Sequence, residues 1–111
     1  MPCRTILTID VLRQFMLGLS MIKSFKCRKT QRLFDGQHVA AFSSFKRQAE
    51  KRLRILDAAI TLEALVALPS NRFERLSGDR VGQYSIRINQ QWRVCFMWDE
   101  GAIDVEIVDY H

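Results

Sequence analysis

The last three residues of the chain carry side chains that can accept and donate protons. Asp109, Tyr110 and His111 supply a carboxylate, a phenol and an imidazole. RNA is cleaved when its 2′-hydroxyl attacks the adjacent phosphate, which needs a base near that hydroxyl, an acid near the 5′-oxygen and positive charge on the phosphoryl group. These side chains, together with a guanidinium, could supply all three without a metal ion. The alternative is that His111 belongs to a frayed chain end.

Three arginines in the last third of the chain could supply the positive charge. Arg87 and Arg93 lie in two segments that we expect to pair as strands, and Arg80 lies in the loop before them. Guanidinium groups match phosphate oxygens with pairs of hydrogen bonds, so we interpret these three arginines as a phosphate-binding group. The alternative is that Glu106 and neighbouring acids neutralise them, which leaves an ordinary solvated face.

The cysteines and the second histidine are interpreted as structural side chains. Cys3, Cys27 and Cys95 are odd in number and widely spaced, which favours small apolar side chains in a reducing cytoplasm over a disulfide framework. His38 precedes a predicted helix and is interpreted as a surface residue. Because the sequence has neither ligand-spaced carboxylates nor a phosphate-binding loop followed by a helix, we expect no metal and no cofactor.

Length and charge indicate one small basic domain. The 111 residues, 48% of them hydrophobic, suffice for a single core, and the formal charge of +5 favours a polyanionic partner such as nucleic acid. Asp10 and Arg13 interrupt the apolar start of the chain, so we expect neither an export signal nor a membrane span. Because Met21 opens the strand-like segment MIKSFKC, we expect residues 1–20 to be an extension and residues 21–111 to be the domain.

Two helices are predicted in the first half of this domain. Residues 43–59 repeat apolar side chains at spacings of four and three, which indicates an amphipathic helix capped by Ser43 or Ser44. A shorter helix is expected to follow its cap, Thr61, to end before Pro69, and to form an antiparallel pair with the first. The core side of the longer helix is predicted to consist of Phe45, Ala49, Leu53 and Leu56.

Three antiparallel strands are predicted after the helices, because apolar and polar residues alternate there. With the helices they predict an α+β fold, in which two helices pack on a curved antiparallel sheet. Core packing is the preferred interpretation of Trp92, Phe96 and Trp98 over stacking on bases. The predicted strands cover residues 84–88, 92–98 and 103–108.

The register of these strands follows from the requirement that their apolar faces coincide. The same register places Arg87 opposite Arg93 on the other face of the sheet. Two opposed cations repel by roughly 0.2–1 kcal/mol, which an anion bound between them would offset. The predicted apolar pairs are Ile88 with Trp92, Ile86 with Val94, Tyr84 with Phe96, Trp98 with Ile103, and Phe96 with Val105.

The order of four short motifs resembles the HigB branch of the RelE/ParE toxin superfamily. The opening MIKSF is also similar to the start of that family, so the resemblance covers residues 21–111. The four motifs are GDR at residues 78–80, SIRIN at 85–89, QWR at 91–93 and the terminal DYH.

The resemblance implies a β-α-α-β-β-β core and the toxin of a type II toxin-antitoxin system. It implies ribosome-dependent cleavage of mRNA, a helix-turn-helix antitoxin of the HigA type as partner, and operator DNA as a target of the toxin-antitoxin complex. It also implies residue roles: Arg93 stabilises the phosphate, Asp109 orients the reacting groups, and Tyr110 and His111 share the work of base and acid.

The loop before the predicted strands departs from the family pattern. Strongly active members can carry a His and a Lys at the positions of Glu74 and Ser77. Our hypothesis is that Glu74 serves as a substitute base, or that cleavage is slower. The alternative function is a non-cleaving protein of the same fold, either a gyrase inhibitor, as in the ParE branch, or a corepressor that binds the antitoxin and DNA.

Overall fold

A computed structural model describes residues 21–109 of the chain. The predicted extension at residues 1–20 lies outside the described residues, as do Tyr110 and His111, so the domain boundary at Met21 stays a prediction. The helices are α2 (Arg28–Phe34), α3 (Lys46–Ala58) and α4 (Leu62–Val66), with 3₁₀ turns η2 (Ala40–Phe45), η3 (Pro69–Asn71) and η4 (Gly78–Arg80). The strands are β1 (Glu74–Arg75), β2 (Tyr84–Arg87), β3 (Trp92–Trp98) and β4 (Ala102–Asp109).

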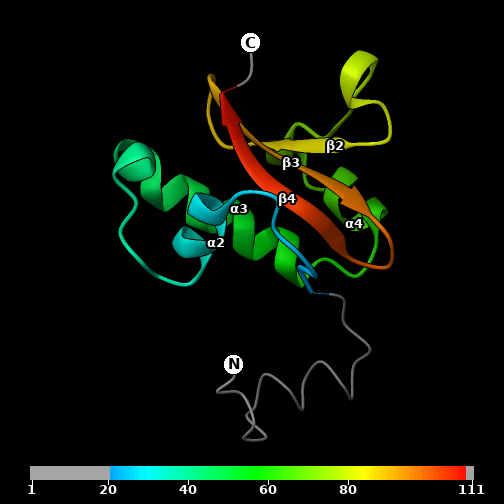
Figure 1. Cartoon of the computed structure of the whole chain (residues 1–111). Coiled ribbons are helices and arrows are strands. Elements are labelled where there is room, and N and C mark those ends of the chain that lie inside the picture. Colours follow the sequence, from blue (N-terminus) through cyan, green and yellow to red (C-terminus); the bar gives the residue numbers. More distant parts are fainter. Residues whose placement is uncertain (1–20, 110–111) are drawn as a thin grey trace, which may run out of the picture.

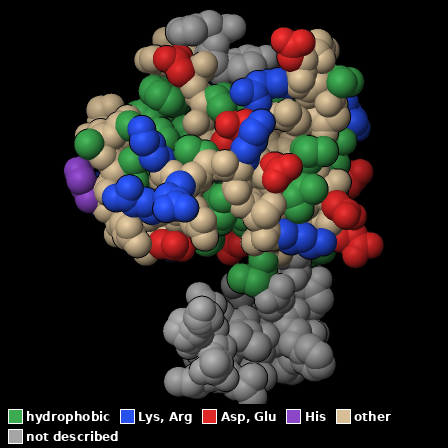
Figure 2. All heavy atoms as spheres, viewed as in Figure 1, with side chains coloured by type: hydrophobic (Ala, Val, Ile, Leu, Met, Phe, Trp, Pro, Cys, Tyr) green, Lys and Arg blue, Asp and Glu red, His purple; other side chains and the backbone are tan. Residues whose placement is uncertain are grey.

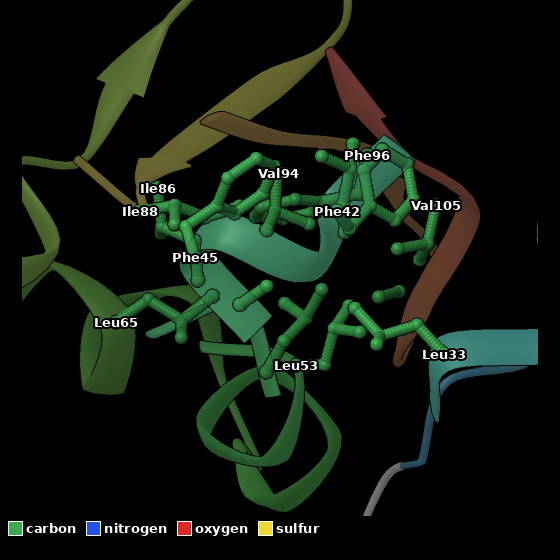
Figure 3. Packing of buried hydrophobic residues seen from close by; sticks show 14 of the residues in the cluster. Leu33, Phe42, Phe45, Leu53, Leu65, Ile86, Ile88, Val94, Phe96 and Val105 are labelled. Carbon is green, nitrogen blue, oxygen red and sulfur yellow. The ribbon is translucent and has the colours of Figure 1, made fainter. Parts of the chain in front are cut away.

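The four strands form one antiparallel sheet in the order β1-β2-β3-β4. Helices α2 and α3 lie on one side of this sheet (Figure 1). The core fills the space between the two layers, where Leu33 of α2, Leu53 of α3 and Leu65 of α4 point toward Val94 and Val105 of the sheet (Figure 3). The predicted α+β class is therefore confirmed.

Helix α3 buries the predicted side, but it begins later than predicted. All four predicted core residues are buried, yet the helix starts at Lys46, and its N-cap, Phe45, makes no side-chain capping bond. The preceding residues form a 3₁₀ turn, in which positions three apart lie on one side. This turn brings Phe42 and Phe45 into the core together. The prediction of Ser43 or Ser44 as the cap is wrong; the Ser43 hydroxyl donates to the Ala40 carbonyl instead.

The helix that lies beside α3 is α2, which the sequence pattern did not predict (Figure 1). It has only seven residues, of which Thr30 and Leu33 are buried, too few to produce a helical period. The predicted antiparallel pairing of α3 with the shorter helix is therefore wrong. That shorter helix, α4, does begin as predicted, because the Thr61 hydroxyl accepts a hydrogen bond from the Ala64 amide at 3.2 Å.

The predicted register of the first hairpin is confirmed. Tyr84 pairs with Phe96 and Ile86 pairs with Val94 on the core face, while Arg87 lies opposite Arg93. Core packing of the tryptophans is confirmed as well. Both are partly buried against the core, and the Trp92 ring stacks on Phe45 with 4.8 Å between ring centroids.

The second hairpin contains a β-bulge that the predicted register lacks. Near the turn, Trp98 pairs with Ala102, one residue away from the predicted Ile103, and Phe96 has no regular partner. Beyond the bulge the predicted offset holds, with Val94 opposite Ile107. The extra residue is Asp104, whose φ of 53° is left-handed and whose amide donates to Ser24 Oγ at 2.8 Å.

The segment that begins at Met21 follows β4 but forms only one parallel bridge, between Phe25 and Val105. The Lys26 amide donates to the Val105 carbonyl at 3.0 Å, and the Val105 amide donates to the Ser24 carbonyl at 3.1 Å. The first strand of the expected β-α-α-β-β-β order is thus reduced to a bridge. A short strand that was not predicted, β1, pairs with β2 at the other edge of the sheet.

Candidate active site

The sheet face turned away from the core carries the predicted phosphate-binding residues. Residues opposite each other in register share a face, so Arg93 and its partners Arg87 and Val108 lie together there, and so do Cys95 and Glu106. Figure 2 shows basic and acidic side chains interleaved on the side of the molecule in view, without a uniform basic surface. The individual contacts therefore decide what this face can bind.

Arg93 is the most firmly held of these residues. Its Nε donates to the buried Ser85 hydroxyl at 2.7 Å, and its Nη2 donates to the Arg72 carbonyl. The residue is only 8% exposed, so the surrounding protein encloses most of it. Because a planar guanidinium fixed at two of its nitrogens cannot turn freely, its direction is set before any ligand arrives.

The Arg72 carbonyl reaches Arg93 because of an unusual backbone conformation. Arg72 ends η3 with φ 47° and ψ 49°, which is the left-handed region. The preceding Asn71 is fully buried; its Nδ2 donates to the Leu65 carbonyl at 3.0 Å, and its Oδ1 accepts from Arg52 Nη1 at 2.8 Å. Burial lowers the pKa of Arg52 from its ordinary value. Helices α3 and α4 thus hold the turn that orients Arg93.

Glu74 lies beside Arg93 on this face of the sheet. It pairs with Ser85 in the β1–β2 register, and its Oε1 lies 3.9 Å from Arg93 Nη2. Its side chain is 53% exposed, so a ligand on this face can reach it. The structure therefore brings together one predicted base and one predicted phosphate ligand from two strands.

Arg80 lies in an ion-pair network with Glu106. Its Nη1 donates to Gln83 Oε1 at 2.9 Å and to Glu106 Oε2 at 3.1 Å. The same carboxylate oxygen lies 3.7 Å from Lys26 Nζ. Glu106 thus balances part of the positive charge, as the alternative interpretation of this face expected, while Lys26 adds a cation that the sequence did not point to.

Arg87 is directed away from this network. Its Nε donates to the Asn89 carbonyl at 3.1 Å, at the turn that follows β2. Although Arg87 and Arg93 are partners in register, Arg93 is held instead by Ser85 and the Arg72 carbonyl. The three predicted arginines thus lie on one face, and the hydrogen bonds described for them go to different partners.

Asp109 lies opposite Trp92, whereas Arg93 lies opposite Val108, so the Asp109 side chain belongs to the other face of the sheet. Its Oδ2 accepts a hydrogen bond from Gln91 Nε2 at 2.9 Å. The described structure thus places this carboxylate at the end of the first hairpin. The roles assigned to Tyr110 and His111 stay predictions, because both lie outside the described residues.

Cys95 lies at the centre of the charged network. Burial raises the pKa of its thiol, an effect that Arg80 and Arg93 oppose and Glu106 strengthens. The side chain is fully buried and kept neutral, so it acts as packing under the site. Cys27 is also a free thiol, and His38 is exposed, as predicted.

Sequence reasoning missed four groups that shape this site. The Arg72 carbonyl and Asn71 gave no signal, because their role depends on a left-handed turn. Ser85 could have been found from the predicted register, which puts it on the arginine face. Lys26 could have been found only from the packing of its segment against β4.

Two further features concern the described residues alone. Across residues 21–109, the structure has no helix that combines the length and the apolar character of a membrane crossing. Within the same range, no three His, Cys, Asp or Glu side chains gather in a way that could hold a metal ion.

Comparison with known proteins places the chain in a family. Residues 23–111 match the family described as "RelE-like toxin of type II toxin-antitoxin system HigB". The chain is also 39% identical over 77 residues to Toxin HigB-1 of Vibrio cholerae serotype O1 (strain ATCC 39315 / El Tor Inaba N16961), a match that covers 69% of this chain and 81% of that protein. The resemblance noted in the motifs is thereby confirmed, and this chain belongs to the HigB-like family of type II toxin-antitoxin toxins.

Proposed function

We propose that this toxin cleaves mRNA on the ribosome and so inhibits translation and growth, with Arg93 holding the scissile phosphate. One observation carries the proposal: the Arg93 guanidinium is oriented in advance by Ser85 and the Arg72 carbonyl, beside the exposed carboxylate of Glu74. A fixed donor aimed at developing charge costs little reorganisation during a reaction, which is how such groups accelerate phosphoryl chemistry.

In the proposed reaction, Glu74 accepts the proton of the 2′-hydroxyl, whose oxygen attacks the adjacent phosphorus. The bond from the 2′-oxygen to phosphorus forms as the bond from phosphorus to the 5′-oxygen breaks. Arg93 stabilises the negative charge on the phosphoryl oxygens, and a proton reaches the departing 5′-oxygen from Tyr110 or His111. The products are a 2′,3′-cyclic phosphate and a free 5′-hydroxyl, and the scheme uses no metal ion.

The position of Asp109 favours an indirect role. Its carboxylate is bonded to Gln91 on the hairpin turn, and the chain continues from it directly into Tyr110 and His111. We propose that Asp109 and Gln91 fix the end of β4 and thereby orient the terminal side chains. Arg80 and Arg87, on the same face as Arg93, are assigned to RNA backbone contacts on either side of the scissile phosphate.

A type II toxin acts together with a protein antitoxin, and for this chain the proposed antitoxin is a helix-turn-helix protein of the HigA type. The proposed complex of toxin and antitoxin binds operator DNA. Because the proposed substrate is mRNA on the ribosome, the proposed place of action is the cytoplasm. The formal charge of +5 supports encounter with ribosomal RNA as well as with the message.

The deciding experiment is to map mRNA ends on translating ribosomes with the full chain and with its Arg93→Ala and Glu74→Ala variants. We expect cuts from the wild type and a loss of rate of about 10²–10³ for Arg93→Ala. Unchanged cleavage by Glu74→Ala would remove Glu74 from the mechanism. Unchanged cleavage by Arg93→Ala would remove the proposed site altogether.

A non-cleaving toxin is the second candidate, because Glu74 and Glu106 already pair with Arg93 and Arg80. A phosphate must compete with these carboxylates, which lowers the affinity that the arginines can offer. This candidate predicts growth arrest without cuts in mRNA. A block of DNA supercoiling in a gyrase assay would identify the target as gyrase, and operator binding without toxicity would indicate a corepressor.

A further inference from the structure

We propose that Lys26 and Arg80 form a second phosphate-binding subsite, in which a phosphate of single-stranded RNA replaces the contacts that both cations make with Glu106. The inference rests on the proposed function, since it takes the RNA that lies at Arg93 as the ligand. It adds Lys26, a residue that is far in sequence from the predicted active loop and strands.

The subsite is defined by two cations that converge on one oxygen. Arg80 Nη1 lies 3.1 Å and Lys26 Nζ lies 3.7 Å from Oε2 of Glu106. Arg80 comes from η4, and Lys26 comes from the segment that runs along β4, so the two approach Glu106 from different elements. One carboxylate faces two cations here, which leaves a surplus positive charge at the site.

Exposure places the cations above the carboxylate. The side chain of Lys26 is 57% exposed and that of Arg80 is 33% exposed, whereas that of Glu106 is only 15% exposed. An anion arriving from solvent therefore meets the ammonium and guanidinium groups before it meets the carboxylate. The Lys26 contact is the weaker of the two, because it is longer and its lysine is exposed. A pair of this kind contributes at most about 1 kcal/mol, so a phosphate can take over Lys26 at low cost.

The subsite lies next to Arg93 along the sheet. Glu106 is the register partner of Cys95, which is two residues from Arg93 on β3 and on the same face. Two residues of a strand span about 7 Å, which is a suitable step from one phosphate to a neighbouring one in an extended strand. Arg80, Glu106, Arg93 and Lys26 all act on the pKa of the buried Cys95 thiol, which agrees with their nearness to one another on this face.

The geometry therefore favours one strand of RNA crossing both positions. The phosphate at Arg93 is the one proposed to react, and the phosphate at Lys26 and Arg80 fixes the register of the strand. Such a contact is sequence-independent, because it reaches the backbone and leaves the base edges untouched. In this arrangement Glu106 limits affinity by competing with the phosphate.

The test measures binding of the full chain to a fluorescent single-stranded RNA by anisotropy at several salt concentrations. The RNA carries 2′-O-methyl groups throughout, so it cannot be cleaved by its own 2′-hydroxyls. The variants are Lys26→Ala, Glu106→Gln, and the control Lys29→Ala, which removes an exposed lysine of α2 three residues away. Thermal unfolding of each variant shows that the fold is kept.

We expect Lys26→Ala to weaken binding about three- to fivefold and to reduce the salt dependence of log K by about 0.7, the value for one phosphate contact on a single strand. Glu106→Gln should tighten binding by a similar factor, because the isosteric amide keeps its place without the competing charge. Lys29→Ala should change affinity by less than about twofold, through net charge alone.

Equal effects of Lys26→Ala and Lys29→Ala would overturn the subsite, as would a Glu106→Gln variant that binds no more tightly than the wild type. Absence of wild-type binding at low salt would overturn it too. Should Glu106→Gln lower the unfolding temperature, Lys26→Arg gives a second measurement, since it must retain the affinity that Lys26→Ala loses. The proposed function fails separately, when ribosomes show no cut mRNA although RNA binding depends on Lys26.

Discussion

The backbone carbonyl of Arg72 accepts a hydrogen bond from the guanidinium of Arg93. The contact comes from a left-handed residue at the end of η3, and it leaves the Arg72 side chain exposed. A backbone acceptor cannot be removed by changing the Arg72 side chain. The orientation of Arg93 is therefore a property of the turn and of the guanidinium together.

Arg93→Lys should test orientation apart from charge. Lysine keeps the positive charge but cannot donate to Ser85 and the Arg72 carbonyl in one plane, so the charge would no longer be fixed toward the phosphate. We expect kcat for mRNA cleavage to fall by about tenfold or more, with a smaller change in KM. The matched control is Arg54→Lys on the exposed side of α3, which should leave both constants unchanged. Equal kcat for Arg93→Lys and the wild type would show that charge alone suffices.

Asn71→Ala should reduce stability, because the amide of Asn71 joins three elements. Its loss leaves the buried Leu65 carbonyl without this donor and removes the acceptor of Arg52. The carbonyl keeps only a long 3.4 Å bond from the Leu68 amide. A buried polar group with so poor a partner costs about 1–3 kcal/mol, so we expect the urea midpoint to fall accordingly. Ser70→Ala is the control, since the Ser70 hydroxyl makes only a long 3.4 Å contact with Arg52. A midpoint for Asn71→Ala equal to that of the control would contradict this account.

Local patterns predicted the parts of the fold that local forces decide. The alternation of apolar and polar residues predicted which side chains of the first hairpin face the core. The pairing of Arg87 with Arg93 could therefore be derived from the apolar residues alone. The Thr61 cap was likewise visible, because its bond spans three residues. Helix α2 was not visible, because its seven residues bury only two side chains.

The sequence pattern could not predict contacts between segments that are far apart in the chain. The bulge at Asp104 depends on Ser24, which is 80 residues away in sequence. The same packing brings Lys26 to Glu106, so the error in register and the missed cation have one cause. In the candidate site, Glu74 and Arg93 were both named from the sequence, and the structure shows that they lie near each other. The support of Arg93 by Asn71 and Arg72 could be found only from the structure.

The Cys95 thiol should make stability depend on alkaline pH. Burial raises its pKa in the folded protein above the ordinary value of 9.0, so above that pH the unfolded chain loses its thiol proton first. The stabilisation that comes from keeping the thiol protonated is fully present below pH 9. It is lost as the pH rises through the pKa of the thiol in the folded protein. We expect the free energy of unfolding to fall more steeply from pH 8.5 to 10 for the wild type than for Cys95→Ala. Parallel curves would show that burial does not hold this thiol neutral.

Gly101→Ala should loosen the segment that carries Lys26. Gly101 has φ 144°, and a Cβ at this position would lie 2.8 Å from the backbone carbonyl oxygen of Met21, which packs against the turn before β4. Backbone cannot move aside as a flexible side chain can, so the change combines left-handed strain with a clash. We expect a loss of unfolding free energy of about 2–4 kcal/mol, measured by urea denaturation.

Gly36→Ala separates these two effects, because Gly36 also has a positive φ, of 91°, but no atom lies within 4 Å of its Cβ position. Gly36→Ala should therefore show the backbone strain alone, a loss of unfolding free energy of about 1 kcal/mol. If the clash is real, Gly101→Ala must be the more destabilising of the two variants. It must also weaken RNA binding as Lys26→Ala does, because the hydrogen bond from the Lys23 amide to the Ala102 carbonyl is the next contact along the displaced segment. Equal losses for the two glycines would mean that residues 21–26 can shift without cost, and that Lys26 is not held at Glu106 by this packing.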